Sequence, residues 1–284
     1  MKILITGSNS YIGNAFMNWL KQWPDQYEIH SISVRGHEWE GKDFSVYDSV
    51  LHVAGIAHVS SDPKMEDLYY QVNRDLAIKV ADKSKKDGVK QFVLMSSIII
   101  YGDDNKIGVE KPITEETTPR PTNFYGKSKL ESDLAVQKMN CESFKTVIVR
   151  TPMVYGPGCK GNFPKLRDIS RWCIAFPNID NKRSMIYIDN LCEFLKLQID
   201  NISDGVFYPQ NREYVATKDI IKTFRDIENK RTYCVNLFNP IVRLLSKKIK
   251  YINKVFGNKY YDKSISNVHE YNVVDFKESI ERSS

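Results

Sequence analysis

Tyr125 and Lys129 lie four residues apart in the stretch NFYGKSKLES, residues 123–132, and would share one face of a helix. A tyrosine hydroxyl is a weak acid near neutral pH, since its ordinary pKa is about 10. A nearby ammonium favours the phenolate and lowers that pKa, so the pair could transfer protons. The same spacing recurs at Tyr214 and Lys218, and accidental pairs are expected in a chain with 16 tyrosines and 41 Lys+Arg. The neighbouring motifs have to distinguish the two pairs.

A second candidate site is the stretch ITGSNSYIG, which separates a short apolar run from a helical pattern. A dinucleotide-binding fold needs a tight turn at this place, where the backbone approaches a pyrophosphate at a helix N-terminus. The spacing follows T-G-x-x-G-x-x-G, with Gly7 and Gly13 outermost and Ser10 in place of the middle glycine. A serine with negative φ can still offer its amide, and its hydroxyl could reach a phosphate. A purely structural turn is the alternative.

The elements around these residues alternate between strand and helix. Apolar runs and apolar periodicity predict strands at 2–6, 27–34, 49–55, 91–97, 145–150 and 185–187, and helices at 12–20, 66–87 and 124–140. Such alternation is typical of a parallel sheet covered by helices on both faces. We therefore expect an α/β fold, a Rossmann-like doubly wound parallel sheet.

The pattern loosens after residue 157, where loops with glycine and proline precede short helices. We expect residues 1–157 to form a dinucleotide-binding domain, to which 184–210 returns. The remainder of 158–284 is expected to form a smaller, interleaved C-terminal lobe that binds substrate.

Composition limits the class of protein. The chain has 284 residues, 42% hydrophobic and 27% charged, which suffices for a sizeable core and argues against disorder. We expect no transmembrane segment and no signal peptide, because long apolar stretches are missing. Five cysteines without a C-x-x-C pair indicate reduced thiols and a cytoplasmic location. His52 and His58 share no helix face and no partner carboxylate, so no metal site is expected, and nothing indicates a nucleic-acid partner.

Residues 240–263 carry much of the formal net charge of +6, with apolar residues interleaved. One interpretation is an amphipathic helix with a solvated basic face. Alternatively, the basic residues could attract an anionic substrate or a membrane surface.

Six motifs occur in the order TGSNSYIG, VAGIAH, VNRD, FVLMSSIIIYG, YGKSK and RTPMVYGPG. As an ordered set they resemble the extended short-chain dehydrogenase/reductases, the NAD-dependent epimerase/dehydratase family that works on nucleotide sugars. The resemblance covers nearly the whole chain. It also selects Tyr125, which follows the SS…YG strand at the family's distance, over Tyr214.

The resemblance implies the roles of the site residues. Tyr125 would exchange a proton with a substrate oxygen while nicotinamide exchanges a hydride with the attached carbon, and Ser97 would hold that oxygen. Lys129 would bind the nicotinamide ribose and lower the tyrosine pKa. The residues implied at the cofactor are Gly7, Ser10, Tyr11, Ile12, Gly13, Ser33, Arg35, Asp43, Phe44, Ala54, Gly55, Ile56, Asn73, Tyr125, Lys129, Pro152 and Val154.

At the substrate the resemblance implies Ser97, Asn162 and Arg183. Arg183 would grip the diphosphate, for which a guanidinium is suited, and Asn162 would offer a polar contact to the same nucleotide. A surface ion pair for Arg183 and a loop cap for Asn162 are the alternatives.

Two departures from the family pattern affect the chemistry. The second strand should end in an acid that bonds the ribose 2′-hydroxyl of NAD, but Ser33 stands there with Arg35 just after. An arginine attracts a 2′-phosphate, which favours NADP(H), with NAD the alternative. Related dehydratases place Asp-Glu after the catalytic hydroxyl, whereas this chain has Ile98 and Ile99, which cannot shuttle protons.

We therefore expect NADP-dependent reduction of the C4 ketone of a nucleotide-diphosphate 4-keto-6-deoxy sugar, for surface polysaccharide synthesis. The alternative is a UDP-sugar 4-epimerase with tightly bound NAD. A redox-sensing binding module is a third reading, against which the intact Ser97, Tyr125 and Lys129 set argues. The expected partner is a UDP- or dTDP-sugar, and a homodimer is compatible with the sequence.

Overall fold

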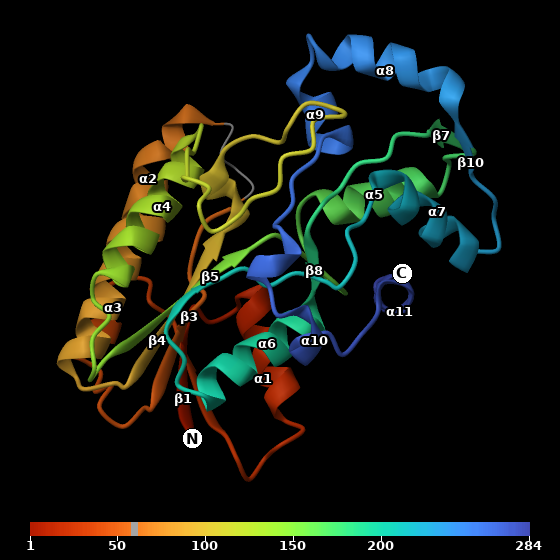
Figure 1. Ribbon diagram of the computed structural model, residues 1–284. Coiled ribbons are helices and arrows are strands. Elements are labelled where there is room, and N and C mark those ends of the chain that lie inside the picture. Colours follow the sequence, from red (N-terminus) through yellow and green to blue (C-terminus); the bar gives the residue numbers. More distant parts are fainter. Residues whose placement is uncertain (58–61) are drawn as a thin grey trace. The chain divides into compact units, whose positions relative to one another are not determined.

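The computed structural model describes residues 1–57 and 62–284, and it divides the chain into two compact units (Figure 1). Unit 1 comprises Met1–Gly102, Thr118–Thr151 and Leu191–Pro209, and unit 2 comprises Asp103–Thr117, Pro152–Asn190 and Gln210–Ser284. The boundary expected from the sequence lies at residue 157, with a return over 184–210. The units instead divide after residue 151, with 103–117 in unit 2.

The order of elements follows the expected alternation. The strands are β1 Lys2–Thr6, β2 Glu28–Ile32, β3 Ser49–His52, β4 Gln91–Ser97, β5 Lys145–Thr151, β6 Met153–Tyr155, β7 Ala175–Pro177, β8 Met185–Tyr187, β9 Gly205–Phe207 and β10 Tyr233–Val235. The helices are α1 Tyr11–Leu20, α2 Glu66–Tyr70, α3 Ala77–Lys86, α4 Phe124–Gln137, α5 Asn162–Ser170, α6 Ile188–Asp200, α7 Thr217–Ile227, α8 Asn239–Ser246, α9 Lys250–Phe256, α10 Val268–Tyr271 and α11 Phe276–Arg282. The six predicted strands and the helices at 12–20 and 124–140 are confirmed. The helix predicted at 66–87 exists but is interrupted by the π-helical segment Gln71–Leu76.

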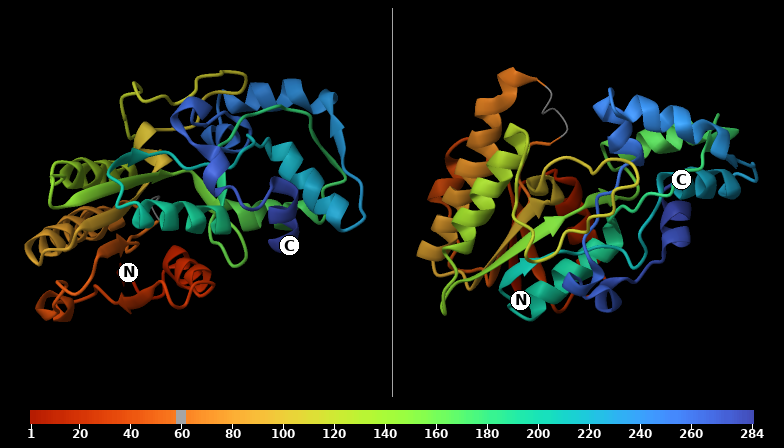
Figure 2. Two further views of the ribbon diagram at one scale, coloured as in Figure 1. Left: turned by 60° about the horizontal axis from the view of Figure 1, so that its bottom comes forward. Right: turned by 45° about the horizontal axis from the view of Figure 1, so that its top comes forward.

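Unit 1 is built on a six-stranded sheet in the order β2-β1-β3-β4-β5-β9. Every neighbouring pair is parallel. Helices α2, α3 and α4 cover one face, and α1 with residues 191–200 of α6 covers the other (Figure 1). The orange-to-lime helices stay together on one face in both views of Figure 2. The predicted Rossmann-like doubly wound fold is thus confirmed.

The central strands β3, β4 and β5 are buried, with apolar residues in the middle of each strand and several buried polar residues toward the ends. Gln91, at the start of β4, is one of these, and its side chain is fully buried. Its amide nitrogen donates to the carbonyl oxygens of Gln198 at 2.8 Å and Ser203 at 3.0 Å, while its oxygen accepts from Ser49 at 2.9 Å. The last segment of unit 1 therefore satisfies a polar group in the middle of the sheet.

Unit 2 contains two small parallel pairs, β6 with β8 and β10 with β7, together with short helices. The basic stretch expected as one amphipathic helix over 240–263 forms two helices instead, α8 and α9, which are separated by Lys247–Ile249. No helix within 1–57 and 62–284 has both the length and the apolar character needed to cross a bilayer.

Candidate active site and cofactor cavity

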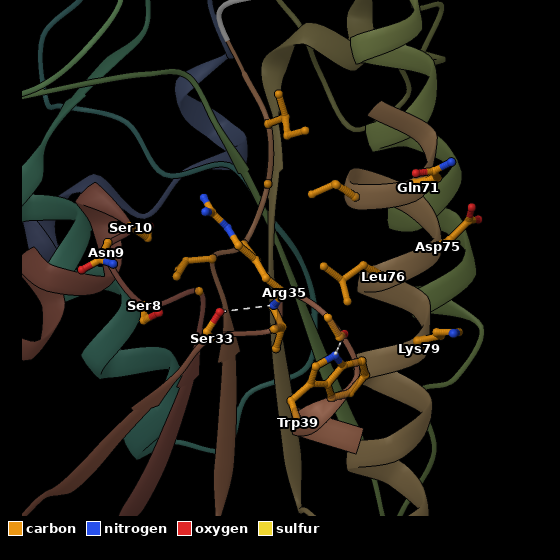
Figure 3. A pocket seen from close by; sticks show the side chains of 18 of the residues that line it. Ser8, Asn9, Ser10, Ser33, Arg35, Trp39, Gln71, Asp75, Leu76 and Lys79 are labelled. Carbon is orange, nitrogen blue, oxygen red and sulfur yellow. Dashed lines mark hydrogen bonds between the residues drawn. The ribbon is translucent and has the colours of Figure 1, made fainter. Parts of the chain in front are cut away.

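A cavity of about 900 Å³ lies in unit 1 beside the ends of β1, β2 and β3. The glycine loop lines one side, and the helical stretch from α2 to α3 lines the other (Figure 3). Among the residues expected at the cofactor, those that line the cavity are Gly7, Ser10, Tyr11, Ser33, Arg35, Ala54, Gly55 and Ile56. The carboxyl ends of parallel strands are the usual place for a ligand in such a sheet.

Gly7 is required by the geometry of the first turn. Its φ is +117°, and a Cβ built on it would lie 2.8 Å from the backbone nitrogen of Ala54. Gly13 serves packing, because its Cβ would meet Val53 and Ile5 at 3.1 and 3.2 Å. The two glycines thus bring the loop and α1 close to the sheet, as a pyrophosphate site at a helix N-terminus demands.

Ser10, where a glycine was expected, is the N-cap of α1. Its φ is −69°, and its hydroxyl accepts from the Gly13 amide at 3.4 Å. Its own amide donates to the Gly7 carbonyl at 3.0 Å, so that amide is engaged within the turn. Tyr11 and Ile12 follow as the first helical residues, where backbone N–H groups lack partners within the helix. These are the donors that could face a phosphate.

Asn73 holds the turn after β3 by pairing with a backbone peptide. Its side-chain oxygen accepts from the Ile56 amide at 2.8 Å, and its nitrogen donates to the Ile56 carbonyl at 3.0 Å. Asn73 lies in the π-helical segment, a feature frequent at functional sites. A Cβ on Gly55 would approach the Asn73 oxygen to 3.1 Å. Asn73 therefore shapes the cavity wall and does not itself line the cavity.

Ser33 and Arg35 follow the end of β2, and the Arg35 side chain lies between the glycine loop and the α2–α3 stretch in Figure 3. The Arg35 amide donates to the Ser33 hydroxyl at 3.3 Å, which shapes the turn. Among the described residues, Arg35 forms no ion pair. Glu40, an acid that also lines the cavity, contacts His37 at 2.8 Å and Lys79 at 3.9 Å.

The expected pair Asp43 and Phe44 does not line the cavity. Phe44 is fully buried in the core, and its amide donates to Asp87 at 3.0 Å. The Asp43 carboxylate accepts from the Ser45 amide at 2.8 Å. Trp39, which was not predicted, lines the cavity and donates from its indole to the Gly36 carbonyl at 3.1 Å. An aromatic residue four positions after Arg35 was the available signal.

Ser97, Tyr125 and Lys129 are brought together by β4 and α4. Asn123 caps α4 by accepting from the Gly126 amide at 2.8 Å, and this fixes where the helix starts. Tyr125 forms a side-chain hydrogen bond with Ser97. Burial raises the pKa of the Tyr125 phenol to about 12, and the bond to Ser97 opposes that rise. At neutral pH the tyrosine is therefore a phenol, able to donate a proton.

Lys129 is 8% exposed, and its ammonium donates to the Met95 carbonyl at 2.9 Å. Burial lowers the pKa of Lys129 to about 8, while the charge of Asp133 opposes that shift. The lowered tyrosine pKa expected from the resemblance is not found. Burial of the phenol is the largest cause, and the hydrogen bond to Ser97 only partly opposes it.

A buried ion pair that the sequence did not predict ties α4 to the sheet. Asp133 on α4 accepts from Arg150 on β5 at 2.9 and 3.0 Å and from the Ser96 hydroxyl at 2.7 Å. Arg150 also donates to Tyr101 at 2.7 Å and Tyr208 at 3.2 Å. Removing one partner would leave a buried charge uncompensated. No residue spacing connects Asp133 with Arg150, so only the fold reveals the pair.

The remaining expected residues lie in unit 2. Arg183 forms an ion pair with Asp104 at 3.0 Å and donates to the Lys254 carbonyl at 3.0 Å. Asn162 is exposed at the start of α5. Pro152 is buried directly after β5, and Val154 lies on β6; neither lines the cavity of unit 1. His58 lies outside the described residues.

These features fit a nicotinamide dinucleotide. Gly7 allows the tight turn that packs on Ala54, the start of α1 supplies amide donors, and the cavity has the size of a cofactor site. Arg35 and Trp39 would meet the adenosine end, since they follow the second strand.

Comparison with known proteins agrees with this geometry. The chain is 28% identical over 269 residues to a UDP-glucose 4-epimerase of Vibrio cholerae, covering 84% of this chain and 81% of the relative. It is 25% identical over 284 residues to an N-acetyl-α-D-glucosaminyl-diphospho-ditrans,octacis-undecaprenol 4-epimerase of Escherichia coli O157:H7, covering 93% and 83%. A dTDP-4-dehydrorhamnose reductase from Clostridium acetobutylicum shares the fold, with a TM-score of 0.72, 18% identity and coverage of 99% and 97%.

The model of the NAD dependent epimerase/dehydratase family matches residues 3–216, which include the glycine loop, the cavity and the Ser97, Tyr125 and Lys129 cluster. The matched region is about three quarters of the chain. The predicted resemblance is thereby confirmed, and the chain belongs to the NAD-dependent epimerase/dehydratase family.

Proposed function

We propose that the protein uses NADP(H) to reduce the C4 ketone of a nucleotide-diphosphate 4-keto-6-deoxy sugar, for surface polysaccharide synthesis. The main support for this proposal lies after the end of β2. Ser33 and Arg35 line the cavity there, where an acidic residue would be expected to bond the ribose 2′-hydroxyl of NAD. A carboxylate there would repel a 2′-phosphate, whereas a guanidinium attracts one. Glu40 contacts His37 and Lys79, which partly offset its charge.

The cluster on β4 and α4 supports reduction. When bound, the nicotinamide supplies the hydride. Ser97 and Tyr125 would hold the ketone oxygen, and Tyr125 would protonate it as charge develops there. A phenol with a pKa raised to about 12 is already in the acid form that this step requires. Lys129 would donate to the cofactor ribose from its buried ammonium.

We further propose that Arg183 and Asn162 contact the diphosphate of the UDP- or dTDP-sugar. Arg183 would need to exchange part of its present pairing with Asp104 for the phosphate oxygens. A guanidinium with five donors can serve a carboxylate and a phosphate together, which makes arginine suitable at such a position.

The cofactor proposal is tested by fluorescence titration of NADPH and NADH against the wild type, Arg35→Ala and the exposed control Lys42→Ala. One charge-assisted hydrogen bond contributes roughly 1.5–3 kcal/mol, so Arg35→Ala should weaken NADPH binding about 10–150-fold. NADH binding should stay within about twofold, and Lys42→Ala should match the wild type. Equal weakening of both cofactors would show that Arg35 does not contact the 2′-phosphate.

The second candidate is 4-epimerisation of a UDP-sugar with tightly held NAD, which the names of the two sequence relatives favour. It is distinguished by the cofactor released on denaturing the purified protein. NAD at about one equivalent, with interconversion of UDP-glucose and UDP-galactose and no added cofactor, would establish the epimerase. NADPH oxidation by dTDP-4-keto-6-deoxyglucose would establish the reductase. The second relative's name also indicates a polyprenol-linked sugar as a third substrate to assay.

A further inference from the structure

Residues 236–256, here called the basic apolar segment, expose large apolar side chains. It consists of the short helix Asn236–Phe238 followed by α8 and α9. The exposed members and their exposed fractions are Leu237 77%, Phe238 37%, Ile241 57%, Leu244 64%, Leu245 42%, Ile249 46% and Tyr251 57%. Apolar residues at this helical spacing normally face a core. In this segment they face solvent, which marks an interaction surface.

The same segment carries almost the whole net charge of the chain. It holds five basic residues and no acidic one, whereas the other 263 residues hold 36 basic and 35 acidic ones. All five side chains are exposed, and none forms an ion pair with a described residue. They are Arg243, Lys247, Lys248, Lys250 and Lys254. An exposed apolar stripe and unpaired cations thus coincide.

The segment is fixed to unit 2 at several points. Asn239 donates to the Asn178 carbonyl at 2.7 Å, and the Lys254 carbonyl accepts from Arg183 at 3.0 Å. The ring of Phe256 packs on Phe176 with centroids 5.4 Å apart. The apolar side chains are therefore presented by a held structure and do not belong to a loose arm.

The exposed apolar surface continues into the strand before the segment. Tyr233 is 59% exposed, and its amide donates to the carbonyl of Ile174, itself 64% exposed, at 2.8 Å. Trp172, two residues earlier, is 85% exposed. Tryptophan and tyrosine are the side chains enriched at membrane–water interfaces.

We propose that the basic apolar segment binds the surface of an anionic membrane. Its apolar side chains would enter the boundary between headgroups and acyl chains, and its cations would lie on the anionic headgroups. A second copy of the chain is a poor occupant, because it would set five unpaired cations against five others. A nucleic acid would neutralise the cations but leave the aliphatic side chains without partners.

The test is cosedimentation of the full-length protein with vesicles of phosphatidylcholine alone or with about one third phosphatidylglycerol. Substrate and cofactor are omitted, so the result does not depend on the proposed reduction. We expect binding to the anionic vesicles at about 0.1 M salt, at least tenfold weaker binding to the neutral ones, and weakening at about 0.5 M salt.

Two variants locate the contact. Lys247→Gln/Lys248→Gln should weaken binding about 25-fold, since each lysine near an anionic surface contributes roughly fivefold. Leu244→Ser should weaken vesicle binding at least about fivefold, because it removes one apolar side chain that would be buried in the membrane. The matched controls, Lys86→Gln/Lys277→Gln and Leu134→Ser, change exposed residues elsewhere and should bind as the wild type does. All these positions are exposed, and circular dichroism would confirm that the variants fold.

Three outcomes would overturn the proposal. The first is no binding to anionic vesicles at about 0.1 M salt. The second is binding that the segment variants leave unchanged. The third is a wild-type dimer in sedimentation that Leu244→Ser dissociates, because a second copy of the chain would then cover the surface.

Discussion

The chain contains two tyrosine–lysine pairs with the same spacing, and the fold gives them opposite surroundings. Tyr125 and Lys129 share α4, whereas Tyr214 precedes α7 and does not share a helix with Lys218. The Tyr214 hydroxyl donates to the Tyr261 carbonyl at 2.8 Å. The pKa of both phenols is raised to about 12, chiefly by burial. The tyrosines therefore do not distinguish the two pairs.

The lysines do. Lys218 contacts Asp180 at 2.5 Å, and hydrogen bonding to that carboxylate raises the pKa of the ammonium. Lys129 has no ion pair within 1–57 and 62–284, and burial lowers the pKa of its ammonium to about 8. Lys218, which is 17% exposed and paired with an exposed carboxylate, keeps its charge. A buried lysine without such a partner can change its charge near the working pH, a property more common at functional sites.

The largest expected effect comes from removing the phenol. Tyr125→Phe should lower kcat by at least about 10², the usual contribution of a positioned acid, because the variant has no proton to donate. NADPH binding should survive. Steady-state kinetics and a fluorescence titration measure the two effects.

Tyr214→Phe is the matched control, since it removes the same hydroxyl from the other pair. Its kcat should equal that of the wild type. If Tyr125→Phe retains more than about a tenth of the activity, the assignment of the catalytic acid is wrong.

The second expected effect is a loss of activity in alkaline solution. The Lys129 ammonium predominates below about pH 8 and is lost above it. If the charged form binds the cofactor ribose, kcat/KM should fall about tenfold per pH unit above that value. Lys129→Arg, which stays charged, should remove the fall even where its activity is lower, and Lys218→Met should leave the profile unchanged. A wild-type profile that stays level beyond about pH 9.5 would contradict the role of Lys129.

The smallest expected effect is a change in the free energy of unfolding with pH, caused by the buried His52 on β3. His52 is 1% exposed and shares a hydrogen bond with the Thr6 hydroxyl at 2.8 Å. Burial, with a smaller effect of Lys129, lowers the pKa of His52 to about 3. The folded state thus binds fewer protons than the unfolded state between about pH 3 and pH 6.5. The free energy of unfolding should fall by up to about 1.4 kcal/mol per pH unit as the pH drops below 6.5.

Urea unfolding at several pH values measures this slope. In His52→Phe, which keeps an aromatic ring beside Phe92, the slope should decrease by about that amount. His269→Phe, which replaces an exposed imidazole, serves as the control. Equal slopes for the wild type and His52→Phe would show that His52 does not titrate as described.

The sequence predicted well those features that short-range patterns encode. Strand and helix periodicity located the six predicted strands and α1, and the ordered motifs identified the family and brought Ser97, Tyr125 and Lys129 into one cluster. The π-helical turn at Asn73 was not predictable, because it breaks the helical period by one residue without a glycine or proline to mark it.

Features that depend on distant residues were also missed. Asp133 and Arg150 are ordinary charges in the sequence, and only the packing of α4 on β5 makes them a buried pair. The pKa of Tyr125 depended on how deeply the ring packs, whereas spacing indicated only that an ammonium was near. The basic stretch had the composition of one amphipathic helix. Its break depends on tertiary contacts that the composition does not encode, such as the bonds from Asn239 to the Asn178 carbonyl and from Asn253 to the Ser246 carbonyl.

The late return of the chain to unit 1 constrains the order of events during synthesis. When the ribosome has completed β5, that strand still has an open edge, because β9 lies more than fifty residues further on. The Gln91 side chain also lacks its hydrogen-bond acceptors until the carbonyls of Gln198 and Ser203 have been made. The nascent sheet thus remains incomplete while most of α5 to α6 is made, and an exposed edge can pair with other chains. Cofactor binding by the emerging chain would help to hold unit 1 together before that edge is covered.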